Sequence, residues 1–272
     1  MWQLRGRDDG PKIRSSARII FLGTGDALNW ERAQTSLAVP LASGAVMLID
    51  ASSGTVLLRQ LEAASISFES VRHLFISHLH FDHAGGLAPL LTAMASLPKA
   101  SITVYATRRT IKGLRELLAL TIPGVEGWLG GRLTWCEIAP GESVRVNDTE
   151  VTPFQVDHGL ECVGFRVTQA GSVAVFTADT RPSPEVVENA KGADLIIHEV
   201  YGLNAEAERA HALGHPTATE AGGVARAAGA RRLMLTHFRA SCFADPKVLA
   251  AEAETCFGRP VEVADDLMTL EF

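Results

Sequence analysis

Short hydrophobic runs recur along the chain and alternate with segments whose apolar residues are spaced as on one face of a helix. The runs predict strands at 19–22, 36–40, 45–49, 71–76, 102–105, 133–138, 143–146, 150–156, 164–168, 172–177, 195–197, 233–235 and within 261–270. The spaced segments predict helices at 55–64, 87–96, 110–120, 184–190, 218–228 and 246–257. The glycine-rich stretch 122–131 predicts a loop, and 133–156 predicts a β-meander.

Strands alternate with helices in both halves of the chain, and each half also contains a meander. This order predicts an α/β (α+β) protein, a four-layer αββα sandwich of two mixed β-sheets with helices outside. No linker or composition shift divides residues 19–272, so we expect them to form a single domain. Residues 1–18 are expected to be a flexible leader, since they contain neither a signal peptide nor a membrane span.

One segment concentrates side chains that bind metals. Between positions 77 and 86 the chain carries His78, His80, Asp82 and His83, directly after a predicted strand. His78 and His80 are two residues apart in an extended segment, so they point the same way and can reach one ion. Asp82 and His83 follow where the chain turns, so we expect them to face a second ion. Imidazole and carboxylate groups suit zinc or a similar divalent metal.

The same pattern, a hydrophobic strand followed by histidine or aspartate, recurs later in the chain. It occurs at His158, Asp179, His198 and His237. Strand ends in a layered protein meet at common edges, so the pattern predicts one metal cleft at such an edge. His73 stands alone at the start of a strand, and we interpret it as structural.

The composition and charge of the chain limit the kinds of partner that it can bind. The 272 residues are 47% hydrophobic and 21% charged, which is typical of a globular protein, and the net charge of −6 argues against a surface built mainly for nucleic acid. The exception is a basic cluster at 108–115, which we interpret first as a solvated helix face. Four cysteines without a CxxC pair predict reduced thiols in a cytoplasmic protein.

The segment His78–His83 resembles the HxHxDH motif of the metallo-β-lactamase superfamily, and His158, Asp179 and His237 follow in the order of its later ligands. Further motifs resemble ribonuclease Z and its relatives, namely FLGTG at 21–25, FTADTRP at 176–182, IHE at 197–199, GHPTA at 214–218 and THF at 236–238. The resemblance covers nearly the whole chain from Ile19 onward. It implies the metallo-β-lactamase fold and a hydrolase that acts on ester bonds.

By this resemblance the cleft holds two divalent metal ions, with zinc as the default and manganese or iron as alternatives. One ion is held by His78, His80, His158 and Asp179. The other is held by Asp82, His83, His237 and the shared Asp179.

The resemblance also implies how catalysis proceeds. A hydroxide that bridges the metal ions is the nucleophile, and Asp82 orients the attacking water or accepts its proton. His215 donates a proton to the leaving oxygen or contacts the scissile phosphate, with Glu199 as a candidate carboxylate partner. The alternative for His215 is a packing or helix-capping histidine. His198 is interpreted as a buried histidine outside the ligand set, and His211 as exposed.

Ribonuclease Z usually carries a long basic arm that grips transfer RNA, inserted between the ligands that match His158 and Asp179. Here the interval 159–178 has room only for two short strands and a turn. We therefore predict a phosphodiesterase acting on a small phosphodiester, such as a cyclic nucleotide. The alternatives are a transfer-RNA 3′-processing endonuclease that binds RNA through 108–115, a sulfatase, lactonase or thioesterase, and a non-catalytic relic. The relatives suggest a homodimer, and no membrane partner is expected.

Overall fold

The computed structural model describes residues 17–241 and 243–272. Apart from its last two residues, the predicted leader at 1–18 lies outside the described residues. The strands are β1 (Arg18–Gly23), β2 (Ser36–Pro40), β3 (Val46–Ile49), β4 (Val71–Phe75), β5 (Ile102–Ala106), β6 (Leu133–Glu137), β7 (Val144–Val146), β8 (Thr149–Gln155), β9 (Val163–Gln169), β10 (Ser172–Phe176), β11 (Leu195–Glu199), β12 (Arg232–Thr236), β13 (Val261–Val263) and β14 (Thr269–Glu271). The α-helices are α1 (Val56–Ala63), α2 (Phe81–Ala84), α3 (Leu87–Ala95), α4 (Arg108–Thr121), α5 (Val125–Leu129), α6 (Pro184–Ala190), α7 (Ala207–Leu213), α8 (Ala218–Ala227) and α9 (Pro246–Phe257).

The strands form two seven-stranded mixed sheets. The first has the order β14-β1-β2-β3-β4-β5-β6, antiparallel from β14 to β3 and parallel from β3 to β6. The second has the order β13-β12-β11-β10-β9-β8-β7, parallel from β13 to β10 and antiparallel from β10 to β7. Parallel neighbours end at the same edge of a sheet, so residues that follow β10, β11 and β12 lie close together.

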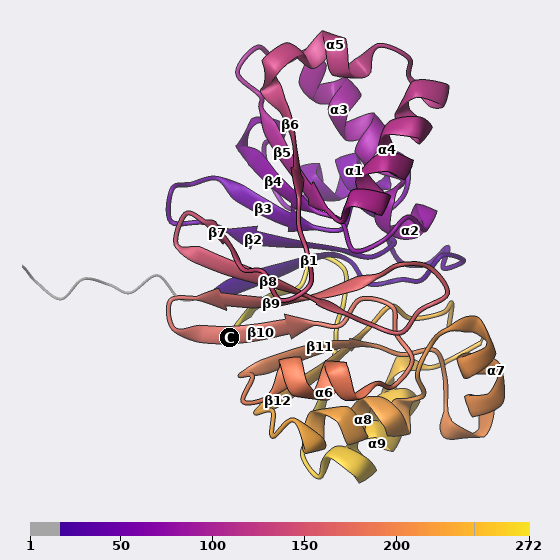
Figure 1. Cartoon of the computed structure of the whole chain (residues 1–272). Coiled ribbons are helices and arrows are strands. Elements are labelled where there is room, and N and C mark those ends of the chain that lie inside the picture. Colours follow the sequence, from indigo (N-terminus) through magenta and orange to yellow (C-terminus); the bar gives the residue numbers. More distant parts are fainter. Residues whose placement is uncertain (1–16, 242) are drawn as a thin grey trace, which may run out of the picture.

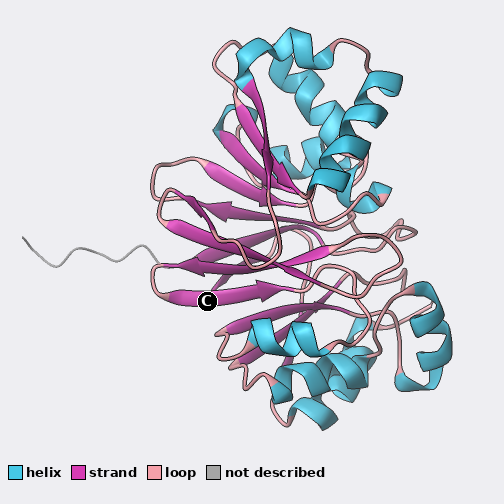
Figure 2. Cartoon of the chain, in the orientation of Figure 1, coloured by secondary structure: helices cyan, strands magenta, loops and turns pink. Residues whose placement is uncertain are grey.

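The two sheets form the central layers and the helices form the outer ones (Figure 2). Helices α1, α3, α4 and α5 lie outside the first sheet, whereas α6, α8 and α9 lie outside the second (Figure 1). The predicted αββα sandwich is therefore confirmed. No helix of the described part of the chain combines the length and apolar character that crossing a bilayer requires.

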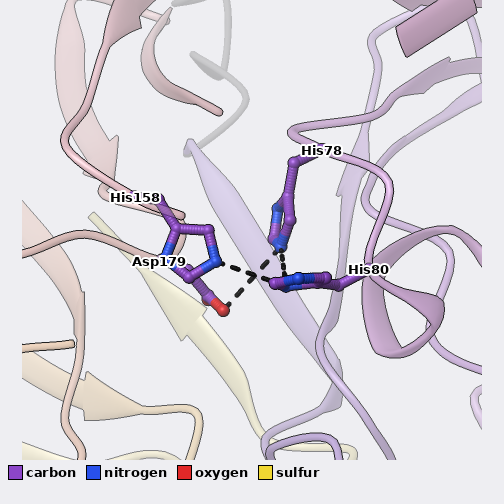
Figure 3. A group of neighbouring side chains, drawn as sticks. All are labelled: His78, His80, His158 and Asp179. Atoms are coloured by element: carbon purple, nitrogen blue, oxygen red, sulfur yellow. Dashed lines mark hydrogen bonds and ion pairs between the residues drawn. The ribbon is translucent and has the colours of Figure 1, made fainter. Parts of the chain in front are cut away.

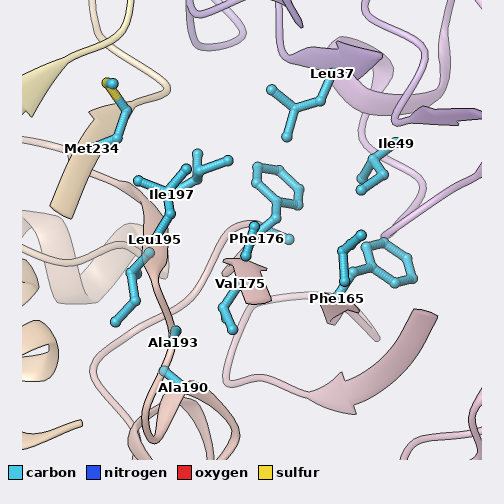
Figure 4. Close-up of a cluster of buried hydrophobic side chains, with 14 of the residues drawn as sticks. Leu37, Ile49, Phe165, Val175, Phe176, Ala190, Ala193, Leu195, Ile197 and Met234 are labelled. Carbon is cyan, nitrogen blue, oxygen red and sulfur yellow. The ribbon is translucent and has the colours of Figure 1, made fainter. Parts of the chain in front are cut away.

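The larger hydrophobic cluster fills the space between the sheets, where Leu37 and Ile49 of the first sheet face Phe165 and Phe176 of the second (Figure 4). It continues between the second sheet and helices α6, α8 and α9. The ring of Phe75 meets that of Phe165 edge to face, with centroids 5.7 Å apart. A second cluster fills the space between the first sheet and its helices. Strand β3 lies between these two clusters and is buried at every position, which explains its uninterrupted hydrophobic sequence.

The prediction of a loop over 122–131 is wrong, because this stretch contains helix α5. Gly124 precedes the helix with a φ of 89°, a conformation that glycine adopts at little cost. Val125 and Leu129 then pack into the cluster beneath the helices and are buried. Burial of these two side chains outweighs the low helix propensity of the surrounding glycines.

The predicted meander over 133–156 is wrong in its pairing. Strand β6 pairs with β5 in the first sheet, whereas β7 and β8 belong to the second. The chain therefore passes from one sheet to the other after β6. Strands β13 and β14 likewise lie in different sheets. A hydrophobic run identifies a strand, but it does not identify the neighbour with which that strand pairs.

Candidate metal centre

The histidine-rich segment leaves the first sheet after β4 and turns into the short helix α2. His78 and His80 lie in the extended part, with His78 Nε2 at 3.0 Å from His80 Nδ1. Asp82 and His83 occupy the single helical turn and are both buried. This arrangement agrees with the expectation that His78 and His80 face one ion site, whereas Asp82 and His83 face a second.

Three residues from the second sheet complete the cluster. His158 follows β8, Asp179 follows β10 and His237 follows β12. The Asp179 carboxylate is buried, with Oδ1 at 3.3 Å from His83 Nε2 and 3.4 Å from His237 Nε2. Its other oxygen, Oδ2, lies 3.8 Å from His78 Nε2. Asp179 therefore stands between the side chains of the two sheets.

The donor atoms gather in two groups that share Asp179, and within each group they lie within 4.8 Å of one another. One group is His78, His80, His158 and Asp179 (Figure 3). The other group is Asp82, His83, Asp179 and His237. These are the two groups that the resemblance implied, and the assignment of these seven residues as ligands stays a prediction.

The hydrogen bonds around the cluster fit metal binding. His83 Nδ1 donates to Asp50 Oδ2 at 2.8 Å, and His158 Nδ1 donates to the carbonyl oxygen of Gly214 at 3.0 Å. With Nδ1 of each ring occupied in this way, Nε2 is the nitrogen of each ring that faces the cluster and could bind a metal. Asp179 Oδ1 is buried there without a hydrogen-bond donor. Imidazole nitrogens that face a buried carboxylate oxygen form an arrangement that could hold a cation.

The pKa shifts show how the site balances charge. Burial lowers the pKa of His78, His80 and His158, which keeps these imidazoles neutral. Burial also opposes protonation of His237, but the nearby carboxylates of Asp179 and Asp82 outweigh it and raise its pKa to about 9. The second group therefore attracts positive charge, which a bound cation would supply.

His215 lies beside the cluster and pairs with Glu199. His215 Nδ1 donates to the Glu199 carboxylate at 2.9 and 3.1 Å, and this carboxylate is buried. Burial opposes protonation of His215, but the Glu199 charge outweighs it and raises the pKa of His215. The ring of His215 lies 5.3 Å from that of His158 and 5.6 Å from that of His237, centroid to centroid. Donor atoms of Asp179, Glu199, His215 and His237 also form a third compact group.

The other histidines discussed in the sequence lie outside the two donor groups that share Asp179. His198 is buried and its Nδ1 donates to the carbonyl oxygen of Glu199. His73 contacts the hydroxyl of Tyr105 at 3.2 Å. His211 was predicted to be exposed, but it is only partly exposed, because its ring bonds to the Glu220 carboxylate at 2.8 Å.

Asp50, Tyr201 and Arg239 belong to the site but were not among the predicted site residues. Asp50 supports it from the end of β3, while Tyr201 and Arg239 line its cavity of about 250 Å³. Asp50 follows the same pattern as Asp179, a buried strand that ends in aspartate, so the sequence did contain an indication of its role. Tyr201 and Arg239 come after strand ends as well, but their residue types do not suggest a metal site.

Replacing Asp50 with asparagine should weaken metal binding about tenfold to a hundredfold. Asp50 Oδ1 accepts from the Ser77 backbone nitrogen, and Oδ2 accepts from both the Ser77 hydroxyl and His83 Nδ1. Asparagine tolerates the φ of 60° at this position, but its amide nitrogen would face donors. Competition with a chelator measures the affinity. Asp194→Asn is the control, because the Asp194 carboxylate accepts from the Val173 backbone nitrogen and lies outside the cavity. An affinity equal to that of the wild type would contradict this role for Asp50.

A model of the β-lactamase superfamily domain matches residues 46–238, a range that contains every member of the cluster. The chain belongs to this superfamily. The prediction of a metallo-β-lactamase-fold hydrolase with a candidate metal site is thereby confirmed.

Named relatives extend the resemblance over nearly the whole chain. Ribonuclease Z of Natronomonas pharaonis is 28% identical, and the alignment covers 94% of this chain and 98% of the relative. Ribonuclease BN of Cronobacter sakazakii is 27% identical over 93% of this chain and 99% of the relative. The predicted resemblance to the ribonuclease Z branch of the superfamily is confirmed.

Solved structures show the same fold. The metallo-β-lactamase fold protein YhfI of Bacillus subtilis has a TM-score of 0.81 at 22% identity, and the alignment covers 94% of this chain and 100% of YhfI. The short form of human tRNase Z has a TM-score of 0.74 at 23% identity, covering 93% and 98%. A diphosphatase of the PhnP family has a TM-score of 0.75 at 18% identity, covering 94% and 98%.

Proposed function

We propose that the chain is a binuclear-metal-dependent phosphodiesterase that acts on a small phosphodiester. The observation that carries this proposal is the hydrogen-bonded pair of His215 and Glu199 beside the two groups that share Asp179. An imidazole held by a buried carboxylate is suited to protonate a leaving alkoxide. The identity of the ions as zinc, a cytoplasmic location and a homodimer stay predictions.

The proposed roles divide between the two sides of the cavity. Two divalent cations bound by the seven predicted ligands would act as Lewis acids toward the phosphoryl group and would make water more acidic. Asp82 accepts a proton from the attacking water, or orients it. On the other side, His215 donates its Nε2 proton to the leaving oxygen, while Glu199 holds Nδ1 and stabilises the charged ring.

Transfer-RNA 3′ processing is the second candidate, and the names of the relatives favour it. Two features argue for a smaller substrate. The interval between His158 and Asp179 is filled by the β9–β10 hairpin, so it has no arm. In the basic cluster, Arg108 is paired with Glu137 and Arg115 with Glu126, each at 3.0 Å, which reduces the charge available to RNA.

Hydrolysis assays on the metal-loaded protein test the proposal. We expect turnover of bis(p-nitrophenyl) phosphate that stops after chelation and returns when zinc is added. A precursor transfer RNA should be cleaved much more slowly under the same conditions. Efficient cleavage of that RNA, with salt-sensitive binding, would replace the proposal with the second candidate. No metal-dependent turnover of either substrate would contradict both.

A further inference from the structure

Arg239 is a nearly buried cation in the cavity of the candidate metal centre. Its side chain is about one-tenth exposed, and it lines the same cavity as His215 and His237. The roles proposed above do not use it. A buried guanidinium is expensive to desolvate, so its placement in a reaction cavity calls for an explanation beyond packing.

Most of the Arg239 guanidinium is fixed by the segment that follows β11. Nε donates to the carbonyl oxygen of Tyr201 at 2.7 Å, and Nη2 donates to both carboxylate oxygens of Glu206 at 2.8 and 2.9 Å. Gly202 permits this arrangement, because a Cβ there would lie 2.3 Å from Glu206 Oε2 and 2.9 Å from Arg239 Nη2. Within the described residues no acceptor bonds to Nη1, which leaves this nitrogen for a ligand.

A stack of planar groups sets the position of Arg239 relative to the reacting centre. The guanidinium lies over the Tyr201 ring, with Cζ 4.1 Å from the ring centroid. The other neighbour of that ring is His215, stacked at 5.8 Å and 14°. His215 in turn stacks on His237 at 5.6 Å. The Tyr201 ring therefore contacts both the arginine and the histidine, and Arg239 is linked to the reacting centre through this ring.

We propose that Arg239 binds a second anionic group of the substrate, a phosphate that is separate from the scissile phosphodiester. This inference rests on the proposed function and narrows its substrate class to phosphodiesters that carry a further phosphate. Guanidinium groups recognise phosphate oxygens through charge-assisted hydrogen bonds, and Nη1 is available for one. Glu206 balances the arginine while no substrate is bound. A cyclic mononucleotide, which has a single phosphate, does not meet this requirement.

A matched pair of substrates isolates the second phosphate. Thymidine 5′-(p-nitrophenyl phosphate) and its 3′-phosphorylated derivative present the same scissile bond and differ in one group. We expect kcat/KM of the wild type to be about tenfold to a hundredfold higher for the phosphorylated ester. In Arg239→Gln the ratio should fall toward one, because glutamine can bond to the Tyr201 carbonyl oxygen but carries no charge. Arg166→Met is the control, since Arg166 also holds backbone carbonyls but does not line the cavity.

Calorimetry with thymidine 5′-phosphate and thymidine 3′,5′-bisphosphate gives a readout that does not depend on turnover. The wild type should prefer the bisphosphate, and Arg239→Gln should lose that preference. Arg239→Lys keeps the positive charge but lacks the planar guanidinium group, so its preference for the bisphosphate should be intermediate. It replaces Arg239→Gln if the glutamine variant does not fold.

Two results would contradict the proposed anion site. The first is a wild type that shows equal kcat/KM for the two esters and equal affinity for the two nucleotides. The second is a folded Arg239→Gln or Arg239→Lys variant that keeps the full wild-type preference for the extra phosphate. Failure of the proposed function looks different. In that case neither ester is hydrolysed, while the preference for the bisphosphate in calorimetry still reports on Arg239.

Discussion

Asp179→Asn should reduce bound metal about tenfold or more and lower phosphodiester turnover by more than about a thousandfold. Asparagine keeps the shape of the side chain but removes its charge. The Asp179 carboxylate belongs to both ligand groups, and its Oδ1 is buried without a hydrogen-bond donor. A neutral amide there would leave the repulsion between two dications unscreened. Its hydrogens could also face the Nε2 atoms of His83 and His237, which are predicted to bind metal.

Metal content by mass spectrometry and turnover of bis(p-nitrophenyl) phosphate measure the two effects on the same samples. Circular dichroism establishes that the variant is folded. Asp194→Asn is the control, since it also removes a carboxylate charge, next to the second sheet, but lies outside the cavity. If the Asp179 variant kept both of its metals and its activity, the shared-ligand assignment would be wrong.

His215→Ala should retain its metals and lose turnover by about a hundredfold to ten-thousandfold. The predicted ligand set is complete without His215, so metal loading should not change. The loss of turnover follows from removing the proton donor and leaving Glu199 buried without its partner. The loss should be smaller for a substrate with a good leaving group, because p-nitrophenolate needs little protonation to depart.

The comparison of leaving groups therefore tests the role itself, using p-nitrophenyl and alkyl esters of the same phosphate. His211→Ala is a neighbouring control, because His211 bonds to Glu220 on the same side of the fold and lies outside the cavity. Equal hydrolysis of the alkyl ester by wild type and His215→Ala would refute the assignment. Loss of metal from the variant would instead place His215 among the ligands, in the third compact group.

The cluster could be predicted from the sequence because its members share a local rule. Each follows a hydrophobic strand, and the carboxyl ends of strands meet at an edge. His78, His158 and His237 are far apart in the chain, yet their position after a strand predicted one common cleft. The pattern also included His198, and the two ligand groups came from the family resemblance. The two-sheet sandwich could be predicted for the same reason, since strands and helices alternate with clear periodicity.

Features that depend on long-range packing could not be read in this way. Helix α5 forms because Val125 and Leu129 are buried, although glycines surround them. The switch of sheets after β6 depends on which neighbour pairs with it, and no local pattern encodes that choice. The roles of Tyr201 and Arg239 emerge only from a stack of rings contributed by separate segments.

The candidate centre draws its donor atoms from both sheets: His78, His80, Asp82 and His83 from the first, and His158, Asp179 and His237 from the second. An ion held there fastens the two halves of the sandwich at one rim. Loading and folding then become linked equilibria, in which the free energy of coordination adds to the conformational stability of the chain. Scarcity of the ion in a cell would therefore lower the amount of folded protein as well as its catalytic activity.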